Sequence, residues 1–291
     1  MKILPVAFDS LGTRSMCTFV ETDNVKILID PAAALGPRRY GLPPHEVEYN
    51  RLRKHWSDII NISTRADIII ITHYHYDHHS PDFPEIYRNK IVYIKDPEKS
   101  INRSQFGRAK RFITAIKPFA KEIHVAEGQT IKIDNTLIEI SRSVYHGTNP
   151  RLGYVVEVFI KDNSTSFLFT SDVEGPVTSS QIEFILNKSP EIIFSDGPMT
   201  YQMQIYGEEN LIRSIENIKK IISLTKVKKY ILDHHLVRDL NFREKLKEVF
   251  KFGEKHGCKI LTAANFLGKE DDLLEARRKE LFRKSSTVFR K

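Results

Sequence analysis

The sequence predicts an α/β sandwich, in which two sheets pack face to face and helices cover the outside. Short β-branched runs bounded by turn residues dominate the first half of the 291-residue chain. Strand-like and helix-like segments alternate in the second half. Continuous apolar runs at 67–72 (DIIIIT) and 191–196 (EIIFSD) indicate strands that are covered on both faces.

The predicted strands are, in order, KILPVAF (2–8), CTFVETDNVKILID (17–30), DIIIITHYH (67–75), KIVYIK (90–95), EIHVAEG (122–128), QTIKIDNTLIEISRSV (129–144), GYVVEVFI (153–160) and SFLFTSD (166–172). Hairpin turns are expected at TDN (22–24) and KIDN (132–135), because Asp and Asn tolerate turn geometry.

Helical periodicity is clearest in SSQIEFILNKS (179–189), EENLIRSIENIKKIISL (208–224), NFREKLKEVFKFGEKHG (241–257) and the tail from Lys269 onward. We find no internal repeat and no low-complexity linker. A single domain over residues 1–291, with a basic helical tail from about residue 269, is therefore expected. Residues 37–58, rich in proline, arginine and aromatic residues, are interpreted as a long insertion between strands and as a candidate lid or substrate-facing surface.

The composition is ordinary for a globular protein, with 41% hydrophobic and 28% charged residues. Two cysteines, Cys17 and Cys258, exclude a disulfide framework and a cysteine-based zinc module. The N-terminus reaches Pro5 and Asp9 too early for the apolar core of a signal peptide, and no run approaches the roughly 18 apolar residues of a membrane span. A cytoplasmic protein without membrane contact is expected.

The net charge of +8 is concentrated at the C-terminus. Residues 276–291 carry seven basic residues and one acidic residue, which is +6 of that +8. The main body therefore gives little support to nucleic-acid binding, and a solvated terminal helix is the simpler interpretation of the tail.

The strongest chemical signal follows the apolar run at 68–71. On a strand, His73 and His75 point to the same side, and Asp77 and His78 follow where a turn can bring them to the same point. Imidazole nitrogen and carboxylate oxygen are ligands of divalent ions such as zinc. Three histidines and an aspartate within six residues supply much of two adjacent metal sites.

The residues THYHYDHH (72–79) resemble the His-x-His-x-Asp-His signature of the metallo-β-lactamase superfamily. That resemblance implies a four-layer αβ/βα sandwich with a dinuclear metal site at one edge. The other motifs of the superfamily are matched in order, each after a predicted strand, by Asp30, His146, Asp172 and the pair His234 and His235. More closely, the stretches DSLGTRSMCTFVET, LIDPAAALGPRRYGLPPHEVE, SDGPMTY and DHHLVRD resemble a mainly archaeal branch of predicted metallo-hydrolases.

The resemblance implies a role for each matched residue. One metal is assigned to His73, His75 and His146. The other is assigned to Asp77, His78 and either His234 or His235, with a slight preference for His234, and Asp172 bridges the two. Asp30 and His79 are expected to support the ligands from behind.

The implied activity is that of a dinuclear metal-dependent hydrolase, in which a metal-activated hydroxide attacks an ester-like or phosphodiester bond and Asp77 also orients that hydroxide. The resemblance favours two zinc ions, because His75 stands where the di-iron oxygen-reducing relatives carry a glutamate; manganese or iron are alternatives. A nuclease of the same superfamily and a non-catalytic binding module remain as alternative functions, and a small-molecule or phosphodiester substrate is the expected partner.

Several smaller features stay open at this stage. Arg38, Arg39 and Tyr40 are candidates for binding an anionic substrate, and a solvated loop is the alternative. Asp196 is interpreted either as substrate-facing or as a turn former. Arg238 with Asp239 is interpreted as a surface pair. Asp9 and Arg14, in an early turn, are noted without a named role.

Overall fold

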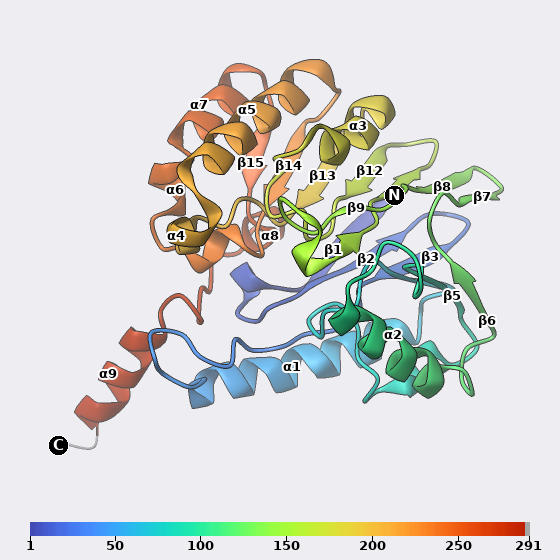
Figure 1. Ribbon diagram of the computed structural model, residues 1–291, viewed down its shortest axis with the longest axis horizontal. Coiled ribbons are helices and arrows are strands. Elements are labelled where there is room, and N and C mark those ends of the chain that lie inside the picture. The colour runs from blue at the N-terminus through green and yellow to red at the C-terminus, as the bar shows by residue number, and fades with distance from the viewer. Residues whose placement is uncertain (289–291) are drawn as a thin grey trace.

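The computed structural model describes residues 1–288, and they form two sheets that pack face to face between outer helices (Figure 1). The first sheet has the order β1-β2-β3-β4-β5-β6, with bounds Lys2–Phe8, Met16–Glu21, Lys26–Ile29, Ile68–Ile71, Ile91–Ile94 and Glu122–Val125. The second has the order β15-β14-β13-β12-β11-β8-β7, with bounds Lys259–Leu261, Lys229–Leu232, Ile192–Ser195, Ser166–Phe169, Val158–Lys161, Thr136–Ile140 and Thr130–Ile133. A separate pair joins β9 (Val144–Tyr145) and β10 (Tyr154–Val155).

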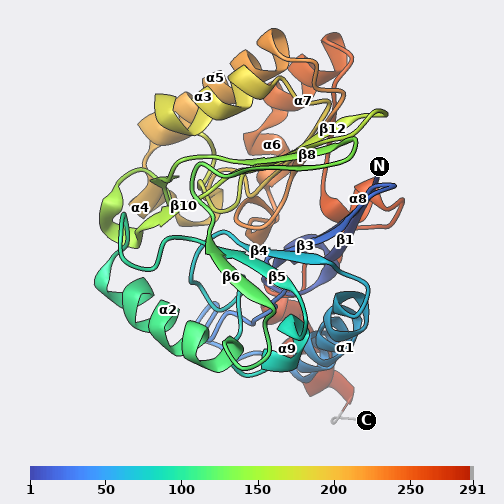
Figure 2. The same cartoon turned by 90° about the vertical axis from the view of Figure 1, so that its right-hand side faces the viewer.

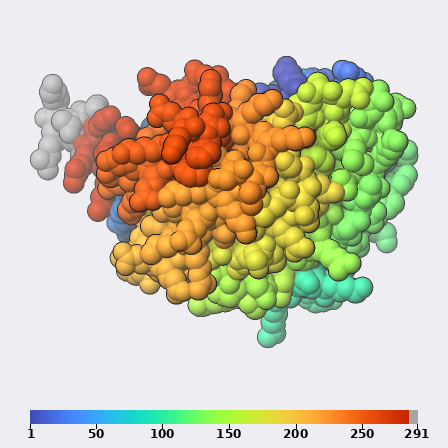
Figure 3. All heavy atoms as spheres, turned by 90° about the horizontal axis from the view of Figure 1, so that it is seen from above, coloured from blue at the N-terminus to red at the C-terminus, as the bar shows by residue number. Residues whose placement is uncertain are grey.

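Helices cover the outer face of each sheet, which gives four layers (Figure 2). The first sheet is covered by α1 (Glu46–Ser63) and α2 (Arg103–Ile116). The second is covered by α3 (Ser179–Lys188), α5 (Glu208–Leu224) and α7 (Lys247–Lys255), whose surfaces form one continuous face in Figure 3. The shorter helices are α4 (Met203–Tyr206), α6 (Phe242–Lys245) and α8 (Ala263–Phe266), and α9 (Arg278–Val288) ends the described chain. The predicted four-layer αβ/βα sandwich is confirmed.

Alternation along β4 shows how the sequence builds these layers. Ile68 and Ile70 face the core between the sheets, where they join Phe167 and Phe194 of the second sheet. Ile69 and Ile71 face the other way and pack with residues of α1 and α2. All four isoleucines are at most 2% exposed, because a parallel strand between two layers is buried on both faces. The predicted hairpins at 22–24 and 132–135 are confirmed by the antiparallel pairs β2–β3 and β7–β8.

The predicted insertion over 37–58 is wrong for its second half, because α1 begins at Glu46. His45 caps this helix: its side chain accepts from the Val47 N–H, and its own N–H donates to Glu48 at 2.8 Å. Buried positions of α1 include Glu48 and His55. Polar residues at buried positions hide the apolar periodicity by which an amphipathic helix is recognised.

The basic tail is anchored to the body rather than solvated throughout. Residues 269–277 form turns and irregular structure, and α9 starts at Arg278, later than the predicted helix start near 269. Arg278 is fully buried and forms a two-point ion pair with Glu48 at 2.7 and 2.8 Å. It also donates to the carbonyl oxygens of Gly36 and Leu42. One positive charge of the tail is therefore buried and paired with a carboxylate inside the fold. Within residues 1–288, no helix is long and apolar enough to cross a membrane.

Replacing Arg278 with alanine should lower the free energy of unfolding by about 3–5 kcal/mol, because it leaves the buried Glu48 carboxylate without its partner. Urea denaturation followed by circular dichroism measures this change. The neighbouring Arg277 is exposed, so Arg277→Ala is the matched control and should change stability by less than about 0.5 kcal/mol. Equal effects of the two substitutions would contradict an anchoring role for the Arg278–Glu48 pair.

Candidate metal centre

The candidate site lies at the edge of the sandwich where parallel strands of both sheets end. Strands β3 and β4 are parallel in the first sheet, and β12, β13 and β14 are parallel in the second. Their carboxyl ends meet at one edge, where ligand sites of α/β folds form. The segments that follow them carry Asp30, His73 to His79, Asp172, Asp196 and the pair His234 and His235.

The histidine-rich motif lies just beyond β4, which ends at Ile71, so His73 and His75 are in a loop rather than on the strand as predicted. The loop turns at once, because the His78 N–H donates to the His75 carbonyl oxygen at 2.9 Å. The side chain of Tyr74, which stands between these two histidines in the sequence, is fully buried, and its hydroxyl donates to the Lys95 carbonyl oxygen.

A first group of donor atoms comes from His73, His75, His146 and Asp172, and these atoms lie within 4.8 Å of one another. His146 Nε2 is 3.1 Å from His75 Nδ1 and 3.5 Å from Asp172 Oδ2. His73 Nε2 is 3.7 Å from the same Asp172 oxygen. This spacing allows all four side chains to face one ion.

A second group comes from Asp77, His78 and His234, again within 4.8 Å. His234 Nε2 lies 3.6 Å from Asp77 Oδ2 and 3.4 Å from Asp172 Oδ2. His78 Nε2 lies 3.2 Å from Asp172 Oδ1. Asp172 therefore touches both groups: Oδ1 faces His78, and Oδ2 faces His73, His146 and His234.

The donor atoms fit a divalent cation. His73 Nε2, His78 Nε2 and Asp172 Oδ1 are buried and make no hydrogen bond within the described part of the chain. Buried polar atoms are nearly always hydrogen-bonded, because an unpaired polar group in the interior is unfavourable. Imidazole nitrogens and a carboxylate that converge without partners are the donor set that zinc and similar ions bind.

Three carboxylates fix the orientation of three of these imidazoles. Asp30 accepts from His78 Nδ1 at 2.8 Å and from the Thr72 N–H and hydroxyl at 2.8 and 2.6 Å. Asp9, which follows β1, is 2.6 Å from His234 Nδ1. In each case a carboxylate on Nδ1 directs Nε2 toward the donor groups. Asp30 thus lies behind His78, and its support of a metal ligand stays a prediction, whereas Asp9 was noted in the sequence without a role.

Asp196 is the third of these carboxylates, 2.7 Å from His235 Nδ1. It is fully buried and also accepts from the Glu174 N–H at 2.6 Å, so it holds His235 in place rather than facing a substrate. His235 Nε2 is 3.9 Å from Asp172 Oδ2, and His235 forms a group with Asp172 and His234.

His79 is buried beside the site. Its Nδ1 donates to the His75 carbonyl oxygen at 2.9 Å, and its ring contacts Tyr74, Tyr76 and Phe112. His79 therefore packs behind the histidine-rich loop, and its support of the proposed ligands stays a prediction.

The backbone at the strand ends is held in an uncommon conformation. Asp30, Ser171, Glu174 and His234 have φ values of +49°, +59°, +55° and +26°, in the left-handed region that non-glycine residues rarely adopt. Strained residues of this kind gather where the fold must aim side chains at one point. Their clustering at this edge is independent support for a functional site.

Glu174 is a further member of the site that sequence reasoning missed. Its Oε1 lies 3.7 Å from His146 Nδ1. Gly147 makes room for it, because a Cβ there would lie 2.4 Å from Glu174 Oε2. Burial raises the pKa of Glu174 despite the nearby His146.

The residues expected at a substrate surface have different surroundings. Arg38 is exposed. Arg39 stacks between the rings of Tyr40 and Tyr201, each 4.7 Å away, and donates to the Arg238 carbonyl oxygen at 2.9 Å. Tyr40 is half-exposed, and its hydroxyl donates to the Ala276 carbonyl oxygen at 3.1 Å. Arg39 and Tyr40 thus brace the loop against neighbouring segments.

Arg238 corrects the sequence interpretation most strongly. It is 4% exposed and donates from Nε to Asp9 Oδ1 at 2.8 Å, so it is not a surface partner of Asp239. Asp239 instead pairs with Lys245 at 2.6 Å. Arg238 Nη2 lies 3.1 Å from His234 Nε2 and 3.9 Å from Asp77 Oδ2.

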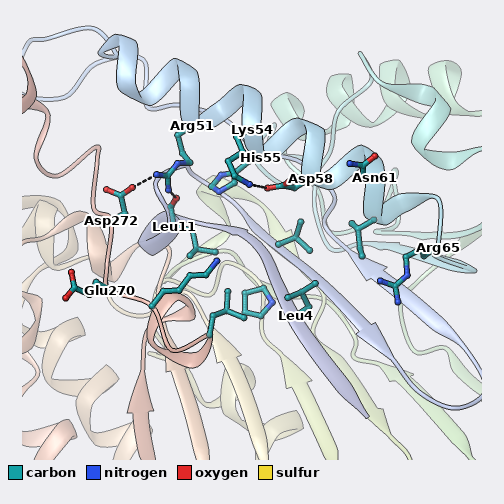
Figure 4. A pocket seen from close by; sticks show the side chains of 15 residues that line it. Leu4, Leu11, Arg51, Lys54, His55, Asp58, Asn61, Arg65, Glu270 and Asp272 are labelled. Atoms are coloured by element: carbon teal, nitrogen blue, oxygen red, sulfur yellow. Dashed lines mark hydrogen bonds and ion pairs between the residues drawn. The ribbon is translucent and has the colours of Figure 1, made fainter.

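A separate cavity of about 810 Å³ lies between α1, β1 and residues 267–272 (Figure 4). Its lining contains no member of the donor groups described above. Two ion pairs lie in its lining, Lys54 with Asp58 at 2.6 Å and Arg51 with Asp272 at 2.7 Å.

Comparison with known proteins agrees with the fold. The family model of the metallo-beta-lactamase superfamily matches residues 12–221. The chain belongs to the metallo-beta-lactamase superfamily, and within it to the group of UPF0282 proteins. A UPF0282 protein from Korarchaeum cryptofilum is 47% identical over 284 residues, covering 97% of this chain and 94% of that protein. A second, from Sulfurisphaera tokodaii, is 46% identical and covers 100% and 96%.

Among solved structures, one described as a possible metal-dependent hydrolase from Veillonella parvula is similar, with a TM-score of 0.53. The alignment covers 89% of this chain and 94% of that one at 13% identity, which supports the fold alone. The superfamily, together with the His/Asp groups, supports a metal-dependent hydrolase in general terms.

The buried His55 should make stability depend on pH. Burial and the nearby Arg51 lower its pKa to about 4, below the value of the unfolded chain, so between about pH 6.5 and 4 only the unfolded chain binds the proton. The free energy of unfolding should fall in that window by up to about 1.4 kcal/mol per pH unit from this group. Urea denaturation at pH 7, 6 and 5 should show a shallower fall for His55→Leu. The same change at the exposed His256 is the control, and equal slopes for His55→Leu and the unchanged protein would contradict the prediction.

Proposed function

We propose that this protein is a hydrolase that uses two divalent metal ions, with zinc favoured, to cleave an ester-like or phosphodiester bond. The observation that carries the proposal is the pair of buried donor groups that share Asp172. Three of these donor atoms, His73 Nε2, His78 Nε2 and Asp172 Oδ1, are buried and make no hydrogen bond in the described chain. The superfamily supplies the class of chemistry.

The proposed ligand sets follow the two donor groups. His73, His75 and His146 would hold one ion, Asp77, His78 and His234 the other, and Asp172 would bridge them. His234 is preferred over His235 because His234, and not His235, is grouped with Asp77 and His78, with its Nε2 at 3.6 Å from Asp77 Oδ2. Nitrogen and oxygen donors of this kind suit zinc and also accept manganese or iron.

When bound, divalent ions would supply Lewis acidity and lower the pKa of a water molecule. The chain's own part in the reaction is orientation and charge. His78 and His234 hold the pKa of Asp77 well below its usual range although burial opposes this, so Asp77 is a carboxylate at neutral pH. Its side chain is 17% exposed, whereas that of Asp172 is 2% exposed. Asp77 is therefore the carboxylate placed to accept a hydrogen bond from the attacking water and to orient it.

Elemental analysis joined to a hydrolysis screen tests the proposal. The purified protein should contain about two divalent ions per chain. The substitution Asp77→Ala should lower hydrolysis by roughly 10²–10⁴-fold, because it removes a ligand and the group that orients the water. Asp82→Ala is the matched control, since Asp82 is an exposed aspartate of the same loop. Fewer than one ion per chain, or activity indifferent to Asp77→Ala, would overturn the proposed function.

Metal loading should release protons from two specific histidines. Burial opposes their charged forms, but Asp172 and Asp30 raise the pKa of His78 well above its usual value, and Asp172 and Asp9 raise that of His234 to about 9. Both are therefore protonated at pH 7 without metal, whereas burial lowers the pKa of His73 well below its usual value and that of His75 to about 3.

A metal ligand must be deprotonated, so loading at pH 7 should release about two protons per chain, measured by calorimetry in buffers of different ionisation enthalpy. The variant His234→Ala should release about one proton fewer. An unchanged count in that variant would show that His234 carries no proton to be displaced.

A further inference from the structure

Arg238 is a buried cation beside the proposed metal ligands, and the proposed function gives it no role. It ends the short helical turn Leu236–Arg238, directly after His234 and His235. Its guanidinium is fixed from behind by the Nε donation to Asp9 Oδ1 at 2.8 Å. Asp9 in turn holds His234 Nδ1 with its other oxygen at 2.6 Å. Arg238 and His234 are therefore positioned by one carboxylate.

The outer edge of this guanidinium faces the donor groups. Nη2 lies 3.1 Å from His234 Nε2 and 3.9 Å from Asp77 Oδ2, the same two atoms that face each other in the second group. Nη1 lies 3.4 Å from the Tyr201 hydroxyl. Of the three guanidinium nitrogens, only Nε donates to Asp9. Nη1 and Nη2 carry two N–H groups each, so beside their contacts with Tyr201 and His234 they retain N–H groups for an acceptor that is not part of the protein.

Neighbouring arginines are not arranged in this way. Arg14 donates from both Nε and Nη2 to the two oxygens of Glu275, at 2.6 and 2.7 Å, so its fork is used inside the protein. Arg39 stacks between two tyrosine rings and donates to a carbonyl oxygen. Of these three arginines, Arg238 alone directs its fork at the proposed ligands.

We propose that Arg238 binds an anionic phosphoryl oxygen of the substrate, which makes a phosphoric ester the substrate class of this site. This inference rests on the proposed function, because it places the reacting group beside the proposed metal ligands. A phosphoric ester is already anionic in its ground state, so a fixed guanidinium next to that point binds it before the reaction begins. A neutral ester carries such a charge only in its transition state.

The geometry favours a phosphoryl group over a carboxylate. Arg238 Nη2 lies 3.1 Å from His234 Nε2 and 3.9 Å from Asp77 Oδ2, so a group bound to the fork also lies next to these proposed ligand atoms. A tetrahedral phosphoryl group can direct one oxygen to the fork and another toward the ions that these ligands would hold. A carboxylate that binds the fork at two points uses both of its oxygens there.

Binding of inorganic phosphate tests this inference without measuring activity. Isothermal titration calorimetry is done on the zinc-loaded protein and, in parallel, on protein treated with a chelator, with zinc content determined for each sample. The substitution Arg238→Gln should weaken phosphate binding by roughly tenfold or more, because charge-assisted hydrogen bonds are lost. Arg238→Lys retains a charge opposite Asp9 and should keep the fold if the glutamine variant fails to fold. It should also bind phosphate weakly, because an ammonium lacks the fork.

The matched control is Arg14→Gln, which removes a nearby guanidinium whose fork is held by Glu275 and should change phosphate affinity by less than about twofold. Acetate should bind more weakly than phosphate and depend less on Arg238. Absence of phosphate binding, affinity that survives both Arg238 substitutions, or acetate binding with the same dependence would overturn the inference. The zinc content is scored separately, so a protein that binds zinc without Arg238-dependent phosphate binding contradicts this inference and leaves the proposed function standing.

Discussion

The buried carboxylate of Asp172 is the point on which the rest of the site depends. It lies after β12 in the second sheet, yet its oxygens face His78, in the loop after β4 of the first sheet, at 3.2 Å and His146, which follows β9 of the separate pair, at 3.5 Å. A carboxylate with 2% exposure is unfavourable unless cations or donors surround it. The histidines that gather around Asp172 are therefore required by its charge as much as by any ion. The two sheets must end at one edge for this cluster to exist.

The support of the histidines repeats a single device. An aspartate at the end of one strand holds a histidine at the end of another: Asp30 after β3 holds His78, Asp9 after β1 holds His234, and Asp196 after β13 holds His235. Each bond places a carboxylate on Nδ1 and turns Nε2 toward Asp172. Two of these bonds join parallel neighbours, β3 with β4 and β13 with β14, and parallel neighbours end at the same edge, so a residue just past one strand reaches a residue just past the next. The bond from Asp9 to His234 instead joins the first sheet to the second.

The fold was predictable from the chain wherever burial left a simple pattern. The isoleucine run of β4 predicted a strand covered on both faces, and the Asp and Asn residues of the two turns predicted the two hairpins. Prediction failed at α1, where Glu48 and His55 occupy buried positions and interrupt the apolar period. Glu48 is buried because Arg278 reaches it from 230 residues away along the chain. A contact between residues so far apart in the chain cannot be predicted from the sequence pattern of either segment.

The same limit explains which site residues the sequence revealed. His73, His75, Asp77 and His78 are close in the chain, and His146, Asp172 and the final pair matched motifs at strand ends. Arg238 and Asp9 could not be joined by such reasoning, because 229 residues separate them and neither belongs to those motifs. Once the strands are placed, Asp9 is seen to serve both His234 and Arg238. The Asp9 carboxylate thereby fixes the positions of His234, a proposed ligand, and of the adjacent Arg238 relative to each other. A change that moved one of them would also displace the other. This coupling is the physical reason to consider the guanidinium part of the site rather than a surface charge.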